Sequence, residues 1–91
     1  MADQQHIVRF SGNVQGVGFR FTACRVAGRY AVTGIVRNCP DGSVQCIVEG
    51  DEKEIEAFVA DLAKTMTGYI DEQTRQVAPH TGKFQGFTVA F

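Results

Sequence analysis

The chain has 91 residues, about the size of one small domain. Hydrophobic residues make up 44% and charged residues 21%, which is an ordinary composition for a globular protein. Nine Lys and Arg against ten Asp and Glu give a net charge of −1, which argues against a nucleic-acid binder, because such proteins carry basic excess. The apolar runs are too short for a membrane span, and the opening MADQQH lacks the features of a signal peptide. We therefore expect one monomeric domain over residues 1–91, without nucleic-acid or membrane partners.

The cysteines and histidines suggest neither disulfides nor a metal site. Cys24, Cys39 and Cys46 are odd in number and irregularly spaced, so we expect free thiols in the reducing cytoplasm. Cys39 is an alternative nucleophile, but no His lies near it in sequence. His6 and His80 form no ligand motif and are interpreted as surface residues. We expect no metal and no cofactor.

Apolar periodicity and turn residues predict alternating strands and helices. In chain order these are a strand over 6–10, a loop over 13–20, a helix over 21–30, strands over 33–38 and 43–49 around a turn at 39–42, a helix over 51–66, and strands over 69–77 and 84–91. Asp51 and Glu54 form a capping-box-like pair for the second helix, and its apolar stripe is expected in the core. This order is typical of an α+β fold, the ferredoxin-like βαββαβ sandwich: an antiparallel sheet of four or five strands with both helices on one face.

The loop before the first helix carries the strongest chemical signal. A glycine-bearing loop entering a helix N-terminus offers unpaired N–H groups where the helix dipole favours an anion. Gly16 and Gly18 permit close approach, and Arg20 can donate two parallel hydrogen bonds to phosphate oxygens. These residues alone fit a phosphate cradle or, equally, a tight turn followed by a surface Arg. Phe21 replaces the third glycine of GxGxxG, and no Gly-Lys-Ser/Thr follows.

The full set of motifs resembles the acylphosphatase family. The matching strings are VQGVGFR at 14–20, GIVRN at 34–38, DGSV at 41–44, VEG at 48–50 and FQGFTV at 84–89. The family shares the ferredoxin-like sandwich. The resemblance implies hydrolysis of small acyl phosphates to a carboxylate and inorganic phosphate, without metal or cofactor.

Site roles follow from the same resemblance. It implies that phosphate is bound by the backbone N–H groups of Gln15, Gly16, Val17, Gly18, Phe19 and Arg20. The Arg20 side chain clamps it, and Asn38 holds the attacking water; on its own, Asn38 reads as a turn-initiating residue. A carboxylate leaving group has a pKa of roughly 4–5 and needs no general acid at neutral pH. Arg37 points to the opposite strand face from Asn38.

Several positions depart from the family pattern. Ile35 stands where many members have Trp, Ala31-Val32 replaces Leu-Gly, and residues 65–81 match poorly. At Ile35 and Ala31-Val32 we expect altered packing or substrate contacts without loss of activity, and residues 65–81, in the outer sheet and loops, are where the resemblance is weakest. The alternative function is a non-catalytic phosphate- or acyl-phosphate-binding module, like the related N-terminal domain of hydrogenase-maturation carbamoyltransferases. Those domains usually have Pro where this chain has Phe21.

Overall fold

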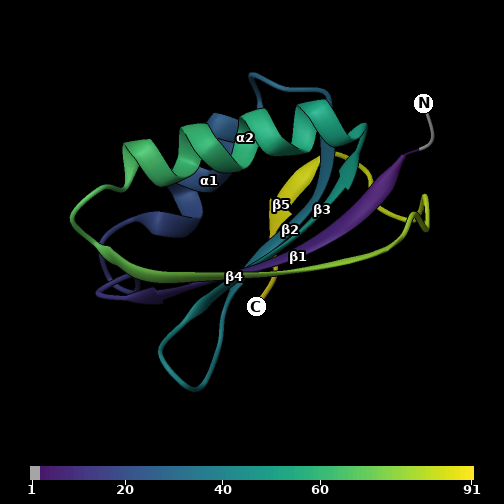
Figure 1. Ribbon diagram of the computed structural model, residues 1–91. Coiled ribbons are helices and arrows are strands. Elements are labelled where there is room, and N and C mark those ends of the chain that lie inside the picture. Colours follow the sequence, from purple (N-terminus) through teal and green to yellow (C-terminus); the bar gives the residue numbers. More distant parts are fainter. Residues whose placement is uncertain (1–2) are drawn as a thin grey trace.

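A computed structural model describes residues 3–91, which form five strands and two helices (Figure 1). The elements are β1 (Gln4–Gly12), α1 (Phe19–Ala27), β2 (Val32–Asn38), β3 (Val44–Gly50), α2 (Glu52–Thr65), β4 (Ile70–Pro79) and β5 (Phe87–Val89). The opening MADQQH is expected not to be part of a signal peptide. Its first two residues, Met1 and Ala2, lie outside the described residues. No helix within residues 3–91 is both long and apolar enough to cross a membrane.

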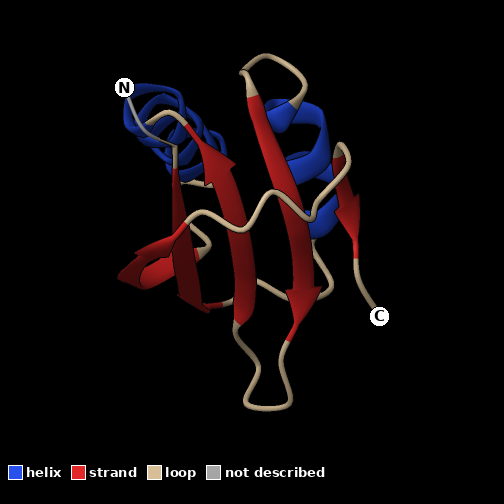
Figure 2. Ribbon diagram, turned by 90° about the vertical axis from the view of Figure 1, so that its right-hand side faces the viewer, coloured by secondary structure: helices blue, strands red, loops and turns tan. Residues whose placement is uncertain are grey.

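The five strands form one sheet in the order β4-β1-β3-β2-β5. The pairs β1–β3, β1–β4 and β2–β3 are antiparallel, as the ferredoxin-like prediction requires. The last strand is shorter than predicted and pairs with β2 in parallel, so the sheet is mixed. This orientation arises because the chain between β4 and β5 crosses the sheet before β5 begins, as Figure 2 shows.

Both helices cover one face of the sheet, and the core lies between them (Figure 1). Alternate strand residues, among them Val8, Phe10, Val44, Cys46 and Val48, point into this core and are fully buried. The apolar stripe of α2 packs against them as predicted. Its buried members are Ile55, Phe58, Val59, Leu62 and Met66.

The helix starts differ from the prediction in two ways. The Asp51 carboxylate accepts a hydrogen bond from the Lys53 N–H (3.2 Å), which confirms it as the N-cap of α2. Glu54 does not complete the capping box; its Oε1 accepts from the Ala31 N–H (2.8 Å) and ties α2 to the segment before β2. The first helix starts at Phe19 instead of residue 21.

The segment between β4 and β5 crosses the sheet face opposite the helices (Figure 2). The buried Glu49 carboxylate fastens it to that face. Glu49 accepts hydrogen bonds from Gln5 Nε2 (2.7 Å), from the Thr81 N–H and hydroxyl (3.1 and 2.7 Å) and from the Gly82 N–H (2.9 Å). Burial raises the pKa of this carboxyl, but these hydrogen bonds outweigh burial and hold the pKa at about 2. Glu49 is thus a buried, fully hydrogen-bonded anion.

His6 is buried, so its interpretation as a surface residue is wrong. It lies on β1 in register with Val48, facing the core side of the sheet. Its Nε2 is 2.8 Å from Gln4 Oε1, and its Nδ1 is 3.4 Å from a guanidinium nitrogen of Arg75, which is paired with Glu56. Burial and the adjacent Arg75 charge lower the His6 pKa, against the smaller opposing effect of Glu56.

Candidate active site

The β1–α1 loop, residues 13–18, gets its shape from two glycines. Gly16 and Gly18 have φ angles of 79° and 78°, in the left-handed region that other residues adopt at a cost. A Cβ built on either glycine meets nothing within 4 Å. The space above both glycines is therefore open, and an anion can reach the backbone there.

The N–H groups of this loop and of the first turn of α1 are unused. Within residues 3–91, none of the six N–H groups of Gln15–Arg20 donates to another protein group. The first bond of α1 runs from the Thr22 N–H to the Gly18 carbonyl (2.9 Å). The positive end of the helix dipole adds to these donors, so an anion can satisfy both at one place.

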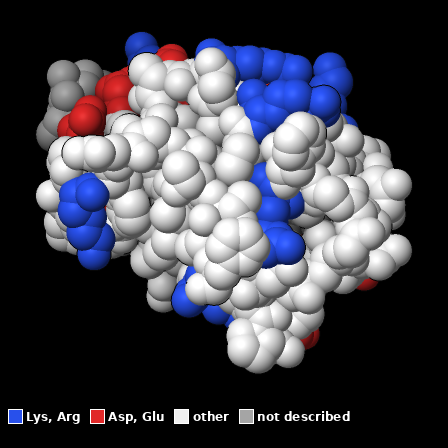
Figure 3. Space-filling view, turned by 180° about the vertical axis from the view of Figure 1, so that it is seen from behind, with Lys and Arg blue, Asp and Glu red and all other residues white. Residues whose placement is uncertain are grey.

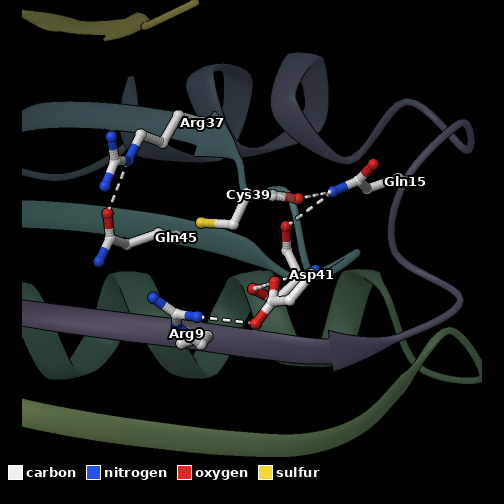
Figure 4. A network of polar contacts seen from close by, with 7 residues as sticks. Arg9, Gln15, Arg37, Cys39, Asp41 and Gln45 are labelled. Carbon is white, nitrogen blue, oxygen red and sulfur yellow. Dashed lines mark hydrogen bonds and ion pairs between the residues drawn. The ribbon is translucent and has the colours of Figure 1, made fainter.

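The side chain of Gln15 joins this loop to the β2–β3 turn. Its Nε2 donates to the carbonyl oxygens of Cys39 and Ser43, both at 2.9 Å (Figure 4). The turn is further held by Asp41, whose carboxylate accepts from the Ser43 N–H and hydroxyl and pairs with Arg9 (2.9 Å). The bonds from Ser43 are the main cause of the lowered pKa of Asp41. Asn38 precedes this braced turn directly and is placed by it.

Arg20 and Asn38 line the same pocket, which has a volume of about 310 Å³. Asn38 lies at the exposed end of β2, and Arg20 lies in the first turn of α1. The Arg20 guanidinium lies 5.5 Å from the ring centre of Phe91 and, in the described part of the chain, pairs with no carboxylate. The two residues singled out by sequence are thus brought together, with one unpaired positive charge available to an anion.

Arg37 and His80 lie at the surface, as the sequence predicts, whereas His6 does not. Arg37 is exposed and donates from Nε to Gln45 Oε1 (2.8 Å; Figure 4), and neither residue is among those that line the pocket. Cys39 and Cys46 are buried free thiols, and burial raises the pKa of Cys46. His80 is exposed, with Nε2 3.4 Å from Glu49 Oε1. Residues 3–91 contain no group of three side chains suited to holding a metal ion.

Sequence reasoning missed two parts of the site. It assigned Gln15 only a backbone role, because nothing in the sequence indicates that its amide reaches a turn 24 residues away. It also missed the apolar side of the pocket, which is lined by Phe21, Cys24, Val89 and Phe91. The i, i+4 spacing of Arg20 and Cys24 on a helix would have placed these two side by side.

Charge is unevenly distributed over the surface despite the net charge of −1. The face in Figure 3 shows Lys and Arg side chains set in a mostly uncharged surface, with Asp and Glu at its margins. A surface region with excess positive charge attracts anionic molecules.

The fold and this pocket define a ferredoxin-like α+β protein whose N–H groups at Gln15–Arg20 have no protein acceptor within residues 3–91. The family model for acylphosphatase matches residues 6–89. An acylphosphatase of Lactobacillus johnsonii is 37% identical over 86 residues, covering 92% of this chain and 94% of the relative. One from Thermococcus kodakarensis is 48% identical over 52 residues, 57% of each chain. The chain belongs to the acylphosphatase family and is an acyl phosphate hydrolase.

Solved structures agree in fold. The acylphosphatase of Bacillus subtilis superposes with a TM-score of 0.88 at 25% identity, over 97% of this chain and 99% of that one. Full-length HypF, described in a phosphate- and nucleotide-bound form, matches with a TM-score of 0.83 at 30% identity. That match covers 98% of this chain but only 12% of HypF, so a domain of this shape also occurs inside a larger protein.

Proposed function

We propose that this protein hydrolyses small acyl phosphates to a carboxylate and inorganic phosphate, using its own backbone and two side chains, without metal or cofactor. The N–H groups of Gln15–Arg20 bind the phosphoryl oxygens, and the Arg20 guanidinium clamps them. Asn38 orients the attacking water. The observation that carries the proposal is that the N–H groups of Gln15–Arg20 have no protein acceptor in the described residues 3–91, next to a pocket that Arg20 and Asn38 both line.

The reaction needs little more than positioning and charge stabilisation. The water oxygen attacks phosphorus, the bond from phosphorus to the acyl oxygen breaks, and the carboxylate leaves with the bonding electron pair. The leaving carboxylate has a pKa of roughly 4–5, so it departs unprotonated at neutral pH. A proton of the water passes to a phosphoryl oxygen. Fixed N–H donors and Arg20 stabilise charge on the equatorial oxygens, while the neutral Asn38 amide accepts from the water without repelling phosphate.

The test is hydrolysis of benzoyl phosphate in EDTA by the wild type, Arg20→Gln and Asn38→Ala. We expect Asn38→Ala to lower kcat by about 10²-fold, because the attacking water is no longer held in position. Arg20→Gln should lower activity and also abolish inhibition by free phosphate. Arg37→Gln is the matched control, because Arg37 adjoins Asn38 in sequence but donates to Gln45, and it should retain full activity. Wild-type activity that EDTA removes would contradict the metal-free proposal.

The second candidate is a phosphate-binding module without turnover, favoured by the match to a small part of HypF. It predicts that the folded wild type binds inorganic phosphate in titration calorimetry but hydrolyses no benzoyl phosphate. Phosphate binding with turnover supports the enzyme, and phosphate binding alone supports the module. The monomeric state remains a prediction, for which sedimentation is the direct measurement.

A further inference from the structure

Two exposed aromatic side chains flank the pocket. Phe21 has 72% of its surface exposed and Phe91 is fully exposed, and both line the pocket with Arg20 and Asn38. A phenylalanine exposed in this way adds little to the core, whose rings are Phe10, Phe19 and Phe58. Two such rings beside one pocket make an apolar surface that a ligand can cover.

Each of the two aromatic rings lies close to an arginine. The Arg20 guanidinium is 5.5 Å from the ring centre of Phe91, and the Arg25 guanidinium is 6.0 Å from that of Phe21. Contacts of a cation with a ring face restrict the ring without burying it. Cys24 and Val89 line the same wall and add apolar surface between the helix and β5.

The pocket lining carries one charged side chain, and it is positive. Arg20 is the only ionisable side chain among the lining residues apart from the Cys24 thiol, whose pKa is raised by burial. No lining residue is acidic, and no second basic residue lines the pocket. The pocket therefore places one cation beside an apolar lining, and it offers no second cation to a ligand that carries an additional carboxylate.

We infer that Phe21, Cys24, Val89 and Phe91 bind the acyl group and select aromatic or bulky apolar acyl phosphates over those that carry a second carboxylate. This inference rests on the proposed function, because the phosphate must occupy the β1–α1 loop for the acyl group to reach this wall. An aryl group covers apolar surface that is otherwise wet, which favours its binding. A second carboxylate placed there loses water and finds no ion pair.

The test compares kcat/KM for benzoyl, acetyl and succinyl phosphate, each normalised to its non-enzymatic hydrolysis rate. We expect benzoyl phosphate to exceed succinyl phosphate by about tenfold or more, the scale of discrimination that a small apolar pocket provides. Phe21→Ser should reduce the benzoyl value by about fivefold to tenfold through KM, and change the acetyl value by less than about twofold. Val77→Ser is the matched control, because Val77 is exposed on β4 at the far edge of the sheet.

The outcomes separate this inference from the proposed function. Acetyl phosphate turnover that Arg20→Gln and Asn38→Ala abolish, with no normalised preference for benzoyl over succinyl phosphate, overturns the inference alone. Equal losses for acetyl and benzoyl phosphate in Phe21→Ser also overturn it. A folded wild type that hydrolyses none of the three substrates overturns the proposed function itself. Preserved circular dichroism of Phe21→Ser verifies that its effect is not unfolding.

Discussion

Gln15 and Cys39 are joined across the site by a hydrogen bond from the Gln15 amide to the Cys39 carbonyl, at 2.9 Å. The same nitrogen donates to the Ser43 carbonyl. One side chain therefore sets the distance between the β1–α1 loop and the turn that follows Asn38. If the loop binds phosphate and Asn38 holds water, their alignment depends on this amide.

Replacing Gln15 with Glu should damage activity more than stability. A carboxylate at this place faces two carbonyl oxygens, has no proton to donate, and pushes the turn away. We expect kcat/KM for acetyl phosphate to fall by about 10²-fold, as for a misplaced reacting group. Gln45→Glu is the matched control, because Gln45 accepts from Arg37 on the opposite face. Equal activity of Gln15→Glu and wild type would show that the loop and the turn are placed independently.

Gly18→Ala should strain the loop where phosphate is expected to bind. Gly18 has φ 78°, and an alanine there costs about 1 kcal/mol in free energy of unfolding. The added Cβ meets no atom within 4 Å, so the effect comes from the backbone. We also expect weaker phosphate binding in titration calorimetry. Gly28→Ala is the control, because Gly28 has a helical φ of −63°; similar effects of both changes would contradict this reasoning.

Glu49 should make stability depend on acid pH. Its pKa is about 2 in the folded protein, against an ordinary 4.5. A depressed pKa stabilises the fold above pH 4.5, and that contribution is lost as pH falls from 4.5 through 2. The shift corresponds to about 3 kcal/mol at neutral pH. We expect Glu49→Gln to lower the free energy of unfolding in urea by about 2–3 kcal/mol at pH 7.

The pH dependence distinguishes this charge effect from a packing effect. Between pH 4.5 and 2 the stability of Glu49→Gln should change less than that of the wild type. Glu72→Gln is the control, because Glu72 is exposed on β4, and it should follow the wild type. Parallel curves for wild type and Glu49→Gln would mean that Glu49 does not titrate with a depressed pKa.

His6 should also make the folding stability fall as pH falls, but at a higher pH than Glu49 does. Burial and Arg75 lower its pKa below 6.5, so the unfolded chain takes up its proton first. The folded state therefore loses stability as pH falls below 6.5, until the folded-state pKa is passed. His6→Gln removes this titration, and its urea unfolding curves should show a flatter dependence between pH 6.5 and 5. NMR titration of the His6 ring in the wild type reads the pKa directly, and a value above 6.5 would refute the prediction.

Local patterns were enough to predict most of the fold. The strand alternation at Val8 and Phe10, the Asp51 cap and the apolar stripe of α2 each depend on neighbours in sequence, and the structure confirms them. The same holds for the turn at 39–42, because Pro40 and Gly42 specify it locally. The β1–α1 loop was recognisable for the same reason: its two glycines and Arg20 fall within one short stretch of sequence, residues 16–20.

Contacts between distant segments were not predictable in this way. Glu54 accepts a hydrogen bond from the Ala31 N–H instead of completing the cap of its own helix. His6 contacts Arg75, which belongs to a strand that comes much later in the sequence. Glu49 is a buried carboxylate only because the segment carrying Thr81 and Gly82 returns to it. The parallel pairing of β5 has the same origin. A single sequence gives periodicity and turns, but it does not show which polar groups become partners in three dimensions.

The groups proposed to bind phosphate in the β1–α1 loop are main-chain N–H groups. Phosphate recognition therefore depends on the backbone conformation of the loop, and few single substitutions can remove a donor. Exchanging Val17 for another side chain leaves its N–H in place, whereas proline alone among the standard residues removes it. The backbone torsions should therefore make Gly16 and Gly18 the least tolerant positions for these donors, while Val17, which packs against the core, should accept other apolar residues but not proline. A change of side chain at Val17 therefore leaves the set of main-chain hydrogen-bond donors constant, whereas the Gln15 amide has no such main-chain substitute.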